Sequence, residues 1–307
     1  MDREDISMKK AVLCFAHKSP EQVNILIRQL LHGTNGQTDV YVHFDKNHEG
    51  ISRSIACGPN VFLIRNNVPV TWGDDSMVRA FENSMREIVA TGRSYDYFIV
   101  CTGQDLLVKR GLDGFLSENN GRIYMDAMER DTGTRILLTH NYPKVMCRHI
   151  PKRTNPIRML RAAYMMLLRT GWIPERKVNF DYSGWRFWYS FNWSAMPYEV
   201  AAYIVRFIDE NPGVMELYRN TFLPEDGFLG TFIMNSPYRD RVEFVDSVHT
   251  KTLTYIPRLI NQHCQFLTME NVPDIAASGC YFSRKFDIAT APDAVAYYER
   301  MILEGAE

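Results

Sequence analysis

The sequence lacks the features that mark secreted, disulfide-stabilised and membrane-spanning proteins. Its six cysteines include no CxxC pair, so we predict a reducing compartment and no disulfide framework. The first ten residues, MDREDISMKK, are charged and contain no apolar segment of the kind found in signal peptides. No apolar run approaches the ~20 residues that a spanning helix needs. These absences predict a cytoplasmic protein.

An excess of charge of one sign is also absent. The formal net charge is -1 at pH 7, so no overall attraction to nucleic acid or to an acidic polymer is predicted. A chain of 307 residues can bury a full hydrophobic core, and it fits one large domain or two modest ones.

Common nucleotide and metal motifs are missing too. The turn after the first predicted strand, AHKSP, contains no glycine, and neither GxGxxG nor a Walker A sequence occurs, which argues against NAD enzymes and P-loop NTPases. No DxD, HxH or HExxH spacing occurs, and a surface loop explains the nearest acidic substitute, residues 129–131, equally well. We therefore expect no metal, and protein cations would have to neutralise any bound diphosphate.

What the sequence does contain is a regular alternation of strands and helices in its first half. Strands are predicted at 10–15, 39–46, 60–65 and 95–105, and helices after Ser19 and over 75–92. Ser19 and Gln22 have the spacing of a capping box, with Pro20 at the first helical position. The alternation predicts an α/β fold with a mainly parallel central sheet flanked by helices. Such sheets bind ligands beyond the carboxyl ends of their strands.

Polar residues follow each of these predicted strands. They are His17 and Lys18, His43 with Asp45 and Lys46, Trp72 and Gly73, and Gly103 with Gln104 and Asp105. We expect a ligand site where they meet. His17 is also compatible with a hydrogen-bonded histidine at a strand end, and Asp45 and Asp105 with turn caps.

The second half contains a basic, apolar segment at 151–178. On a helix, Arg158, Arg161 and Arg169 fall within one quadrant. Both a helix at the membrane surface and a core helix with an arginine edge fit this pattern. Further on, a strand leading into a helix is predicted over 190–213.

Two charged pairs are candidates for chemistry. Glu225 and Asp226 stand between a proline and an apolar run, where they either offset a helix dipole or provide a catalytic base. Arg284 and Lys285 lie between two phenylalanines, and they are either an ordinary surface dipeptide or cations for a phosphate.

Seven segments occur in the order of a known family. They are AVLCFAHKSPEQVNILIRQL, VYVHFDKN, TWGDDSMVRA, YDYFIVCTGQDLLVK, FNWSAMPYEVAAYIV, LPEDGFLGTFIMNSPY and FLTMENVPDIAASGCYFSRKFD. Together they resemble the core-2/I-branching β-1,6-N-acetylglucosaminyltransferase family, which also contains the peptide O-xylosyltransferases. The resemblance covers roughly residues 9–290 and suggests a bacterial-type member.

The resemblance implies a GT-A-like fold without DxD and metal-independent, inverting transfer from a UDP-sugar. It places the base at Asp226 by position, with Glu225 as the alternative, because the two acids are exchanged relative to the family pattern. On the donor side it implies His17, His43, Asp45, Gln104 and Asp105, to which the strand-end pattern adds Trp72. The diphosphate contacts are Lys285 with either Arg284 or Arg258. Trp193 and its neighbour Asn192 are the acceptor-side candidates, although Trp193 also fits a core aromatic.

We therefore expect one glycosyltransferase domain over 1–307. Its nucleotide-sugar-binding half lies at about 9–125, its acceptor and catalytic half at about 126–290 and a C-terminal helix at 291–307. The expected reaction is β-1,6 transfer of N-acetylglucosamine from its UDP donor to a glycan or lipid-linked glycan. The expected pathway makes a bacterial polysaccharide or glycolipid, and residues 157–169 are the candidate for peripheral contact with the inner membrane. Another UDP-sugar, such as xylose or galactose, and a non-catalytic nucleotide-sugar- or glycan-binding protein remain alternatives.

Overall fold

The computed structural model describes residues 8–148, 150, 152, 154–243, 252–257 and 265–305. Within these ranges, seven strands form the main sheet in the order β3-β2-β1-β4-β7-β6-β8. Strand β7 is antiparallel to both of its neighbours, and the other pairings are parallel. The strands are β1 Lys10–Ala16, β2 Thr38–Phe44, β3 Val61–Leu63, β4 Tyr97–Thr102, β6 Ile123–Glu129, β7 Trp188–Pro197 and β8 Val242–Glu243.

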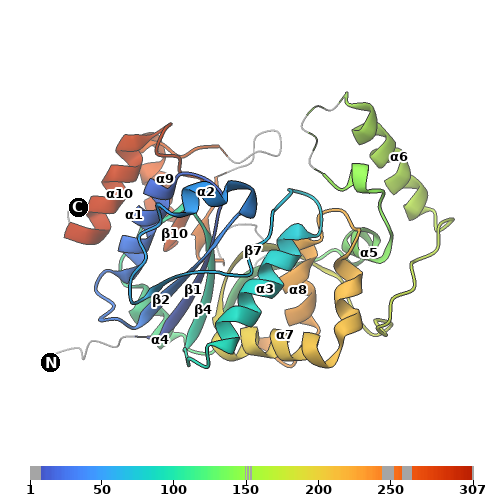
Figure 1. Ribbon diagram of the computed structural model, residues 1–307, viewed down its shortest axis with the longest axis horizontal. Helices are drawn as coiled ribbons and strands as arrows, with labels where there is room; N and C mark the ends of the chain where they lie inside the picture. Colours follow the sequence, from blue (N-terminus) through green and yellow to red (C-terminus); the bar gives the residue numbers. More distant parts are fainter. Residues whose placement is uncertain are drawn as a thin grey trace.

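Helices cover both faces of this sheet (Figure 1). The α-helices of the described residues are α1 Pro20–Leu31, α2 Glu49–Ser52, α3 Ser76–Ala90, α4 Leu112–Glu118, α5 Asp131–Thr139, α6 Pro156–Arg169, α7 Tyr198–Glu210, α8 Glu225–Met234, α9 Val272–Ser278 and α10 Pro292–Glu304. The alternation of side chains along β1 divides the core, because Val12 and Cys14 pack with α1 and α10 while Ala11 and Leu13 pack with α3, α7 and α8. All seven residues of β1 are buried, as its continuous apolar run predicts.

A second, smaller sheet joins distant parts of the chain. Among the described residues it has the strand order β5-β10-β9, with β5 at Asp105–Leu107, β9 at Thr254–Tyr255 and β10 at Phe282–Arg284. The register between β10 and β5 places Arg284 opposite Asp105. The segment that follows β4 is thereby fixed to the C-terminal part of the chain.

The start of α1 differs from the predicted capping box. Ser19 has φ 49° and ψ 63°, in the left-handed region, and its side chain makes no capping hydrogen bond. The Gln22 side-chain amide instead donates to the carbonyl oxygens of Gly103 at 3.0 Å and Phe286 at 3.2 Å. A tertiary contact has thus replaced the local one, and Gln22 connects the loop after β4 to the segment after β10.

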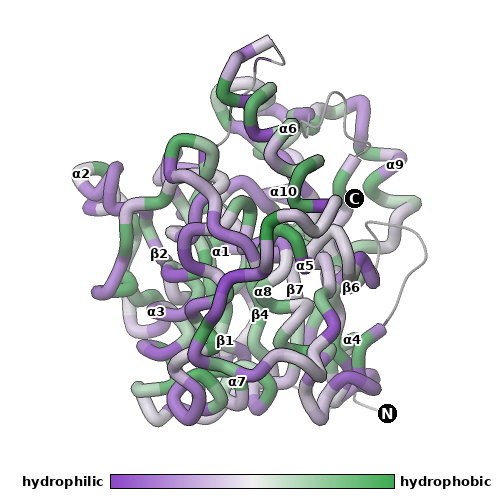
Figure 2. Tube along the Cα trace, turned by 90° about the vertical axis from the view of Figure 1, so that its right-hand side faces the viewer, coloured by the Kyte–Doolittle hydropathy of each residue, from purple (hydrophilic) through white to green (hydrophobic). Residues whose placement is uncertain are grey.

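The fold class predicted from the sequence, α/β with a mainly parallel sheet flanked by helices, is confirmed. Strands from both predicted halves of the chain share the sheet, and α6 occupies half of the basic segment. Figure 2 shows α6 at the top of the molecule, above the sheet. Throughout the part of the chain that the structure describes, no helix has the length and apolar character needed to cross a membrane.

Candidate active site

The carboxyl ends of β1, β2 and β4 bring the predicted polar residues together. These three strands are neighbours in the order β2-β1-β4, and the chain leaves each of them at the same edge of the sheet. The backbone amides of Asp45 and Gly103 both donate to β1, to Ala16 O and Phe15 O at 2.8 Å each. The residues that follow the three strands therefore meet at one edge, as expected for a ligand site.

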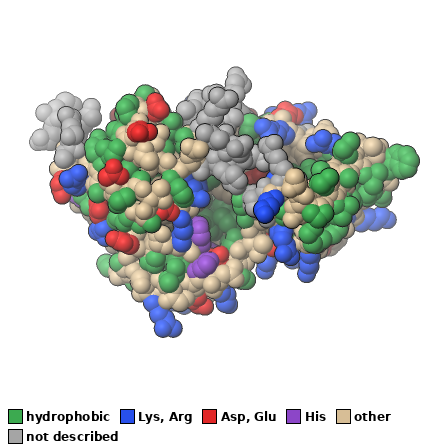
Figure 3. Space-filling model, turned by 90° about the horizontal axis from the view of Figure 1, so that it is seen from above, with side chains coloured by type: hydrophobic (Ala, Val, Ile, Leu, Met, Phe, Trp, Pro, Cys, Tyr) green, Lys and Arg blue, Asp and Glu red, His purple; other side chains and the backbone are tan. Residues whose placement is uncertain are grey.

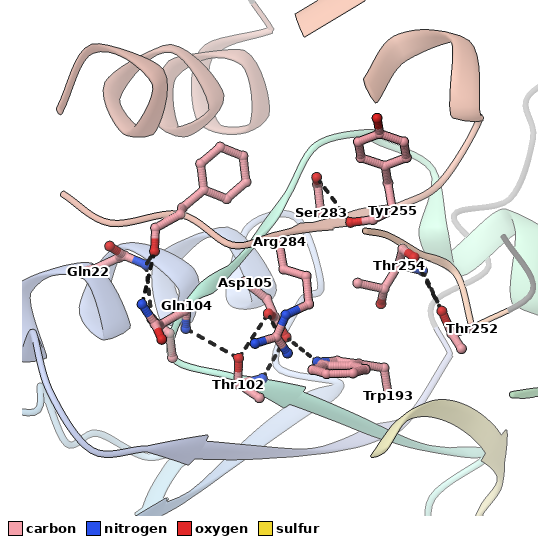
Figure 4. Close-up of polar contacts among 12 residues, drawn as sticks. Gln22, Thr102, Gln104, Asp105, Trp193, Thr252, Thr254, Tyr255, Ser283 and Arg284 are labelled. Atoms are coloured by element: carbon pink, nitrogen blue, oxygen red, sulfur yellow. Dashed lines mark hydrogen bonds and ion pairs between the residues drawn. The ribbon is translucent and has the colours of Figure 1, made fainter. Parts of the chain in front are cut away.

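Asp105 is the centre of a buried polar network at this edge (Figure 4). One carboxylate oxygen accepts from the Thr102 amide at 2.7 Å and from the Trp193 indole N–H at 3.1 Å. The other accepts from the Thr102 hydroxyl at 2.9 Å and lies 3.6 Å from Nη1 of Arg284. Burial raises the pKa of the Asp105 carboxyl, while Arg284 and these donors act in the opposite direction.

Arg284 and Trp193 complete this network. The guanidinium carbon of Arg284 lies 3.8 Å from the centroid of the Trp193 ring, within cation–π range. The charge of Arg284 is therefore directed at Asp105 and the indole, which disfavours the predicted diphosphate contact for this arginine. Trp193 is half-buried. Its indole N–H donates to Asp105 and its ring face contacts Arg284, so the orientation of the ring is fixed.

Close approach of backbone segments explains the glycine at this edge. A Cβ atom on Gly103 would lie 2.8 Å from Cγ2 of Val23 and 3.2 Å from Cβ of Ala16, so a larger residue would displace α1 from β1. Gln104 is buried beside it and exchanges two hydrogen bonds with Phe286, accepting at 2.9 Å and donating at 3.4 Å. Gln104 thus anchors the loop.

A cluster of cations lies where β1 ends. The ammonium groups of Lys18 and Lys285 lie 5.5 Å and 5.6 Å from the centroid of the partly exposed Phe266 ring. Lys18 also forms an ion pair with Asp287. Partial desolvation and then the charges of Lys18 and Lys285 lower the pKa of the nearby His17. Two ammonium groups beside one ring and one histidine are suited to an anionic ligand. The sequence placed His17 and Lys18 together at this strand end and gave Lys285 a diphosphate contact, but it gave no sign of Phe266.

His43 and Asp45 support the loop after β3. His43 is 1% exposed, its Nε2 accepts from the Val68 amide at 3.1 Å, and burial lowers its pKa to about 4. The structure contradicts the expectation that His43 contacts a donor directly, because its side chain is enclosed. Asp45 accepts from the amides of Asn47 at 2.9 Å and Val70 at 3.1 Å, as the turn-cap alternative predicts.

The acid pair lies at the start of α8. Glu225 is 4% exposed, and its Oε2 has no hydrogen-bond partner among the described residues. Burial, then the neighbouring charge of Asp226 and that of Asp74, raise the pKa of Glu225 well above its usual value. Both acids stand in the first turn of α8, where carboxylates also offset the helix dipole, so that alternative stays open.

Asp226 is more accessible than Glu225 and is half-buried. Burial raises its pKa to about 7, while the positive charge of Arg130 lowers it. The Arg130 guanidinium lies 4.7 Å from the centroid of the Tyr189 ring, and burial followed by the charge of Asp226 raises the pKa of Tyr189. A carboxyl poised near neutral pH beside a cation has the properties of a general base. Sequence reasoning gave Arg130 no role at this site.

A row of aromatic rings along β7 connects the acid pair to the Asp105 network. Successive ring centroids lie 5.5 Å apart for Tyr189 and Phe191, and 5.8 Å apart for Phe191 and Trp193. Alternate residues of a strand share a face, so Asn192 lies on the opposite face, with Ser190, whose hydroxyl accepts from the α8 backbone. The structure therefore places Asn192 and Trp193 on opposite faces of β7, and their acceptor-side roles remain predictions.

The loop that carries Trp72 is held against the start of α8. The Leu223 amide donates to Gly73 O at 3.0 Å, and Leu223 adopts φ 54°, so the chain turns sharply just before the acids. The Trp72 side chain is 52% exposed. Its donor-side role remains a prediction, and the structure adds that its loop borders the acid pair.

Two further predictions concern Arg258 and a metal. Arg258 lies outside the described residues. Over the ranges that the structure describes, no group of three or more His, Cys, Asp or Glu side chains is arranged to hold a metal ion.

The raised pKa values predict how stability depends on pH. Unfolding returns Glu225 and Asp226 to values near 4.5 and 3.8, so the folded protein binds more protons at intermediate pH. Their stabilising protonation is complete below these unfolded values and is lost as the pH rises through about 7. We expect the free energy of unfolding in urea to fall between about pH 5 and pH 8, and less steeply in Glu225→Gln. An equal slope in the variant and the wild type would contradict the burial of an ionisable Glu225.

A family comparison identifies the class of protein that this fold and site belong to. The profile described as Core-2/I-Branching enzyme matches residues 13–257, which include the C-terminal part of β1, the aromatic row of β7 and the acid pair. The chain belongs to the core-2/I-branching enzyme family, a family of glycosyltransferases, as the sequence motifs indicated. No curated protein matches the sequence significantly.

Several solved structures are similar over much of the chain. The bifunctional glycosyltransferase WbbM is 14% identical, with a TM-score of 0.33 over 91% of this chain, which spans 45% of the length of WbbM. The galactosyltransferase LgtC, solved with donor and acceptor sugar analogues, is 9% identical, with a TM-score of 0.38 over 96% of this chain and 94% of its own. UDP-glucose pyrophosphorylase from Leishmania major is 9% identical, with a TM-score of 0.30 over 68% of this chain and 53% of its own. Similarity this low says nothing about donor or acceptor.

Proposed function

We propose that this family member transfers N-acetylglucosamine from its UDP donor to a hydroxyl of a glycan or lipid-linked glycan, forming a β-1,6 linkage with inversion and without a metal. The sugar and linkage rest on the seven resembling sequence segments. The same resemblance supports a bacterial pathway for a polysaccharide or glycolipid. The mechanism rests on the site itself.

The environment of Asp226 is the observation that supports the proposed mechanism most directly. Inverting transfer needs one carboxylate on the acceptor side to take a proton from the attacking hydroxyl. Asp226 is half-buried, its pKa of about 7 leaves a useful fraction ionised at neutral pH, and Arg130 favours that ionised form. Glu225 is enclosed, and burial favours its neutral form, so it is the less suitable of the two as a base.

The proposed reaction is a single displacement. As the acceptor oxygen attacks the anomeric carbon, its proton passes to the Asp226 carboxylate, a carbon–oxygen bond forms and the bond to the diphosphate breaks. The bonding electrons leave with UDP, so negative charge grows on the diphosphate. Attack from the side opposite the leaving group inverts the anomeric configuration.

The cluster of Lys18, Lys285 and His17 is suited to stabilise that growing charge. The two ammonium groups carry two positive charges against the one carboxylate of Asp287, which leaves an excess for a diphosphate. Arg284 is turned toward Asp105 and acts on the donor through the orientation of Trp193 and the loop after β4. Protein cations therefore fill the role that a divalent ion has in other nucleotide-sugar enzymes.

The aromatic row along β7 provides a surface for the acceptor. Tyr189, Phe191 and Trp193 extend from the neighbourhood of Asp226 to that of Asp105. Flat apolar rings pack against sugar faces, and one end of the row lies beside the proposed base. An acceptor sugar on the row would direct a hydroxyl at Asp226.

The function is tested by release of free nucleotide diphosphate from UDP-, GDP- and dTDP-sugars, with EDTA and with added Mn²⁺. We expect slow hydrolysis of UDP-N-acetylglucosamine that persists in EDTA, because the cations of the site belong to the protein. Hydrolysis of UDP-xylose or UDP-galactose instead would change the donor and keep the mechanism. Activity only with Mn²⁺ would overturn metal independence. Calorimetry showing donor binding, without turnover even with glycan acceptors, would favour the non-catalytic alternative.

A further inference from the structure

Helix α6 presents an apolar face to solvent. Four large apolar side chains on it are exposed, and Trp172, three residues after its end, is 83% exposed; the four are Met159, Leu160, Met166 and Leu167, with Met166 at 69%. Their spacing repeats after seven residues, so they lie along one side of the helix. A surface helix ordinarily turns such a stripe toward the core.

The orientation of α6 is fixed by its opposite face. Arg161 is buried there, donates to Met146 O at 2.8 Å and Arg148 O at 2.9 Å, and places its guanidinium carbon 3.9 Å from the Phe222 ring centroid. Leu168 packs beside it in a small cluster with Tyr142. Turning the apolar stripe inward would break these contacts and bury polar backbone without partners. The exposed stripe therefore follows from how the helix is anchored.

The segment that carries this stripe contains acidic or basic side chains of one sign only. Residues 132–174 contain eight Lys or Arg residues and no Asp or Glu. Lys144, Arg148, Lys152 and Arg169 are exposed near or on the helix. A second copy of the chain on this stripe would bring like charges together. A partner with an anionic surface and an apolar interior would complement both the basic side chains and the apolar stripe.

The stripe and the site open on the same side of the molecule. Figure 3 views this side from above, and it shows apolar side chains gathered over α6 next to Lys and Arg, with a hollow bordered by histidine and basic side chains nearby. Phe222, which stacks on Arg161, stands three residues before Glu225. The anchored face of α6, opposite the stripe, is therefore the one that lies toward the segment carrying the acid pair.

We propose that α6 and Trp172 dock the protein on an anionic lipid bilayer. The methionine, leucine and tryptophan side chains enter the boundary between head groups and acyl chains, and the Lys and Arg side chains contact the anionic head groups. Docking in this orientation holds the site against the bilayer, where a lipid-linked acceptor would be presented. The proposal itself does not depend on which sugar is transferred.

Cosedimentation of the full chain with vesicles tests the docking. We expect binding to vesicles that mix phosphatidylglycerol with phosphatidylcholine, weaker binding at high salt, and little binding to phosphatidylcholine alone. Met159→Ser combined with Met166→Ser should lower the partition coefficient about tenfold or more, because two apolar side chains no longer leave water. Ile51→Ser, at an exposed apolar residue of α2, is the matched control and should bind as the wild type does.

Three results would overturn the proposal. They are no binding to the anionic vesicles at low salt, an equal effect of the α6 and Ile51 variants, and a dimer in light scattering that the α6 variant converts to a monomer. The last would make the stripe a self-association surface. UDP release without vesicles should be the same in the α6 variant and the wild type, so a failure of docking and a failure of the proposed activity are distinguishable.

Discussion

Asp226→Asn is expected to lower kcat by at least ~10²-fold, the scale of a general-base contribution. The amide keeps the size of the side chain but cannot accept the acceptor proton at neutral pH. Donor binding should change little. The cations proposed to contact the diphosphate lie near the end of β1, whereas Asp226 lies in the first turn of α8. Steady-state kinetics with a glycan acceptor, together with calorimetry of UDP-sugar binding, would separate these two effects.

Glu225→Gln is the matched control for that variant. Because burial favours the neutral form of Glu225, the uncharged glutamine should retain activity within about tenfold. A large loss in Glu225→Gln with little loss in Asp226→Asn would assign the base to Glu225 instead. Affinity retained in both variants with no turnover in the wild type would indicate a binding protein.

Lys285→Met is expected to reduce kcat by about 10²-fold, because a group that stabilises developing charge contributes more in the transition state than in the ground state. Methionine keeps much of the side-chain volume beside Phe266 and removes the ammonium group. The donor KM should rise by a smaller factor. Lys285→Arg should restore part of the activity, since it returns the charge with a different shape.

Lys109→Met provides the control for the lysine substitution. Lys109 also lies over an aromatic ring, 4.8 Å from the centroid of Tyr281, but it donates to Gly279 O away from the strand ends that form the site. Its loss should leave kcat and KM unchanged. Equal losses in Lys285→Met and Lys109→Met would mean that a general change in stability or charge, rather than contact with the diphosphate, explains the effect.

Local patterns in the sequence predicted the elements that depend on neighbouring residues. The run at 10–15 became β1, the periodic segment at 75–92 became α3, and the helix in the basic segment became α6. The acid pair was also found, because its two members are adjacent and stand before an apolar run. In each case the determining contacts lie within a few residues, which periodicity can detect.

Contacts between distant residues could not be predicted in this way. Asp105 binds a tryptophan 88 residues away, and it pairs with Arg284 only because β10 joins β5. The partner of Lys285, Phe266, and the partner of Asp226, Arg130, likewise come from other elements. For the same reason the sequence did not show that Arg161 would face inward and leave the apolar side of α6 outside.

The relative orientation of Asn192 and Trp193 could have been predicted from the sequence. Asn192 and Trp193 are consecutive in a predicted strand, so strand geometry alone places them on opposite faces. Gln22 illustrates the opposite case. Its capping-box spacing was correct, but the carbonyls of Gly103 and Phe286 outcompeted the local bond once the chain had folded.

The central claim, that Asp226 is the base at a site without a metal, is tested most directly by the pH dependence of kcat/KM in EDTA. Because the base must be ionised, the account predicts that kcat/KM falls about tenfold per pH unit below about 7 and levels off above it. The Asp226→Asn variant should lose this dependence along with its activity. A wild-type profile that is flat through neutral pH, or one that appears only with Mn²⁺, would contradict the account.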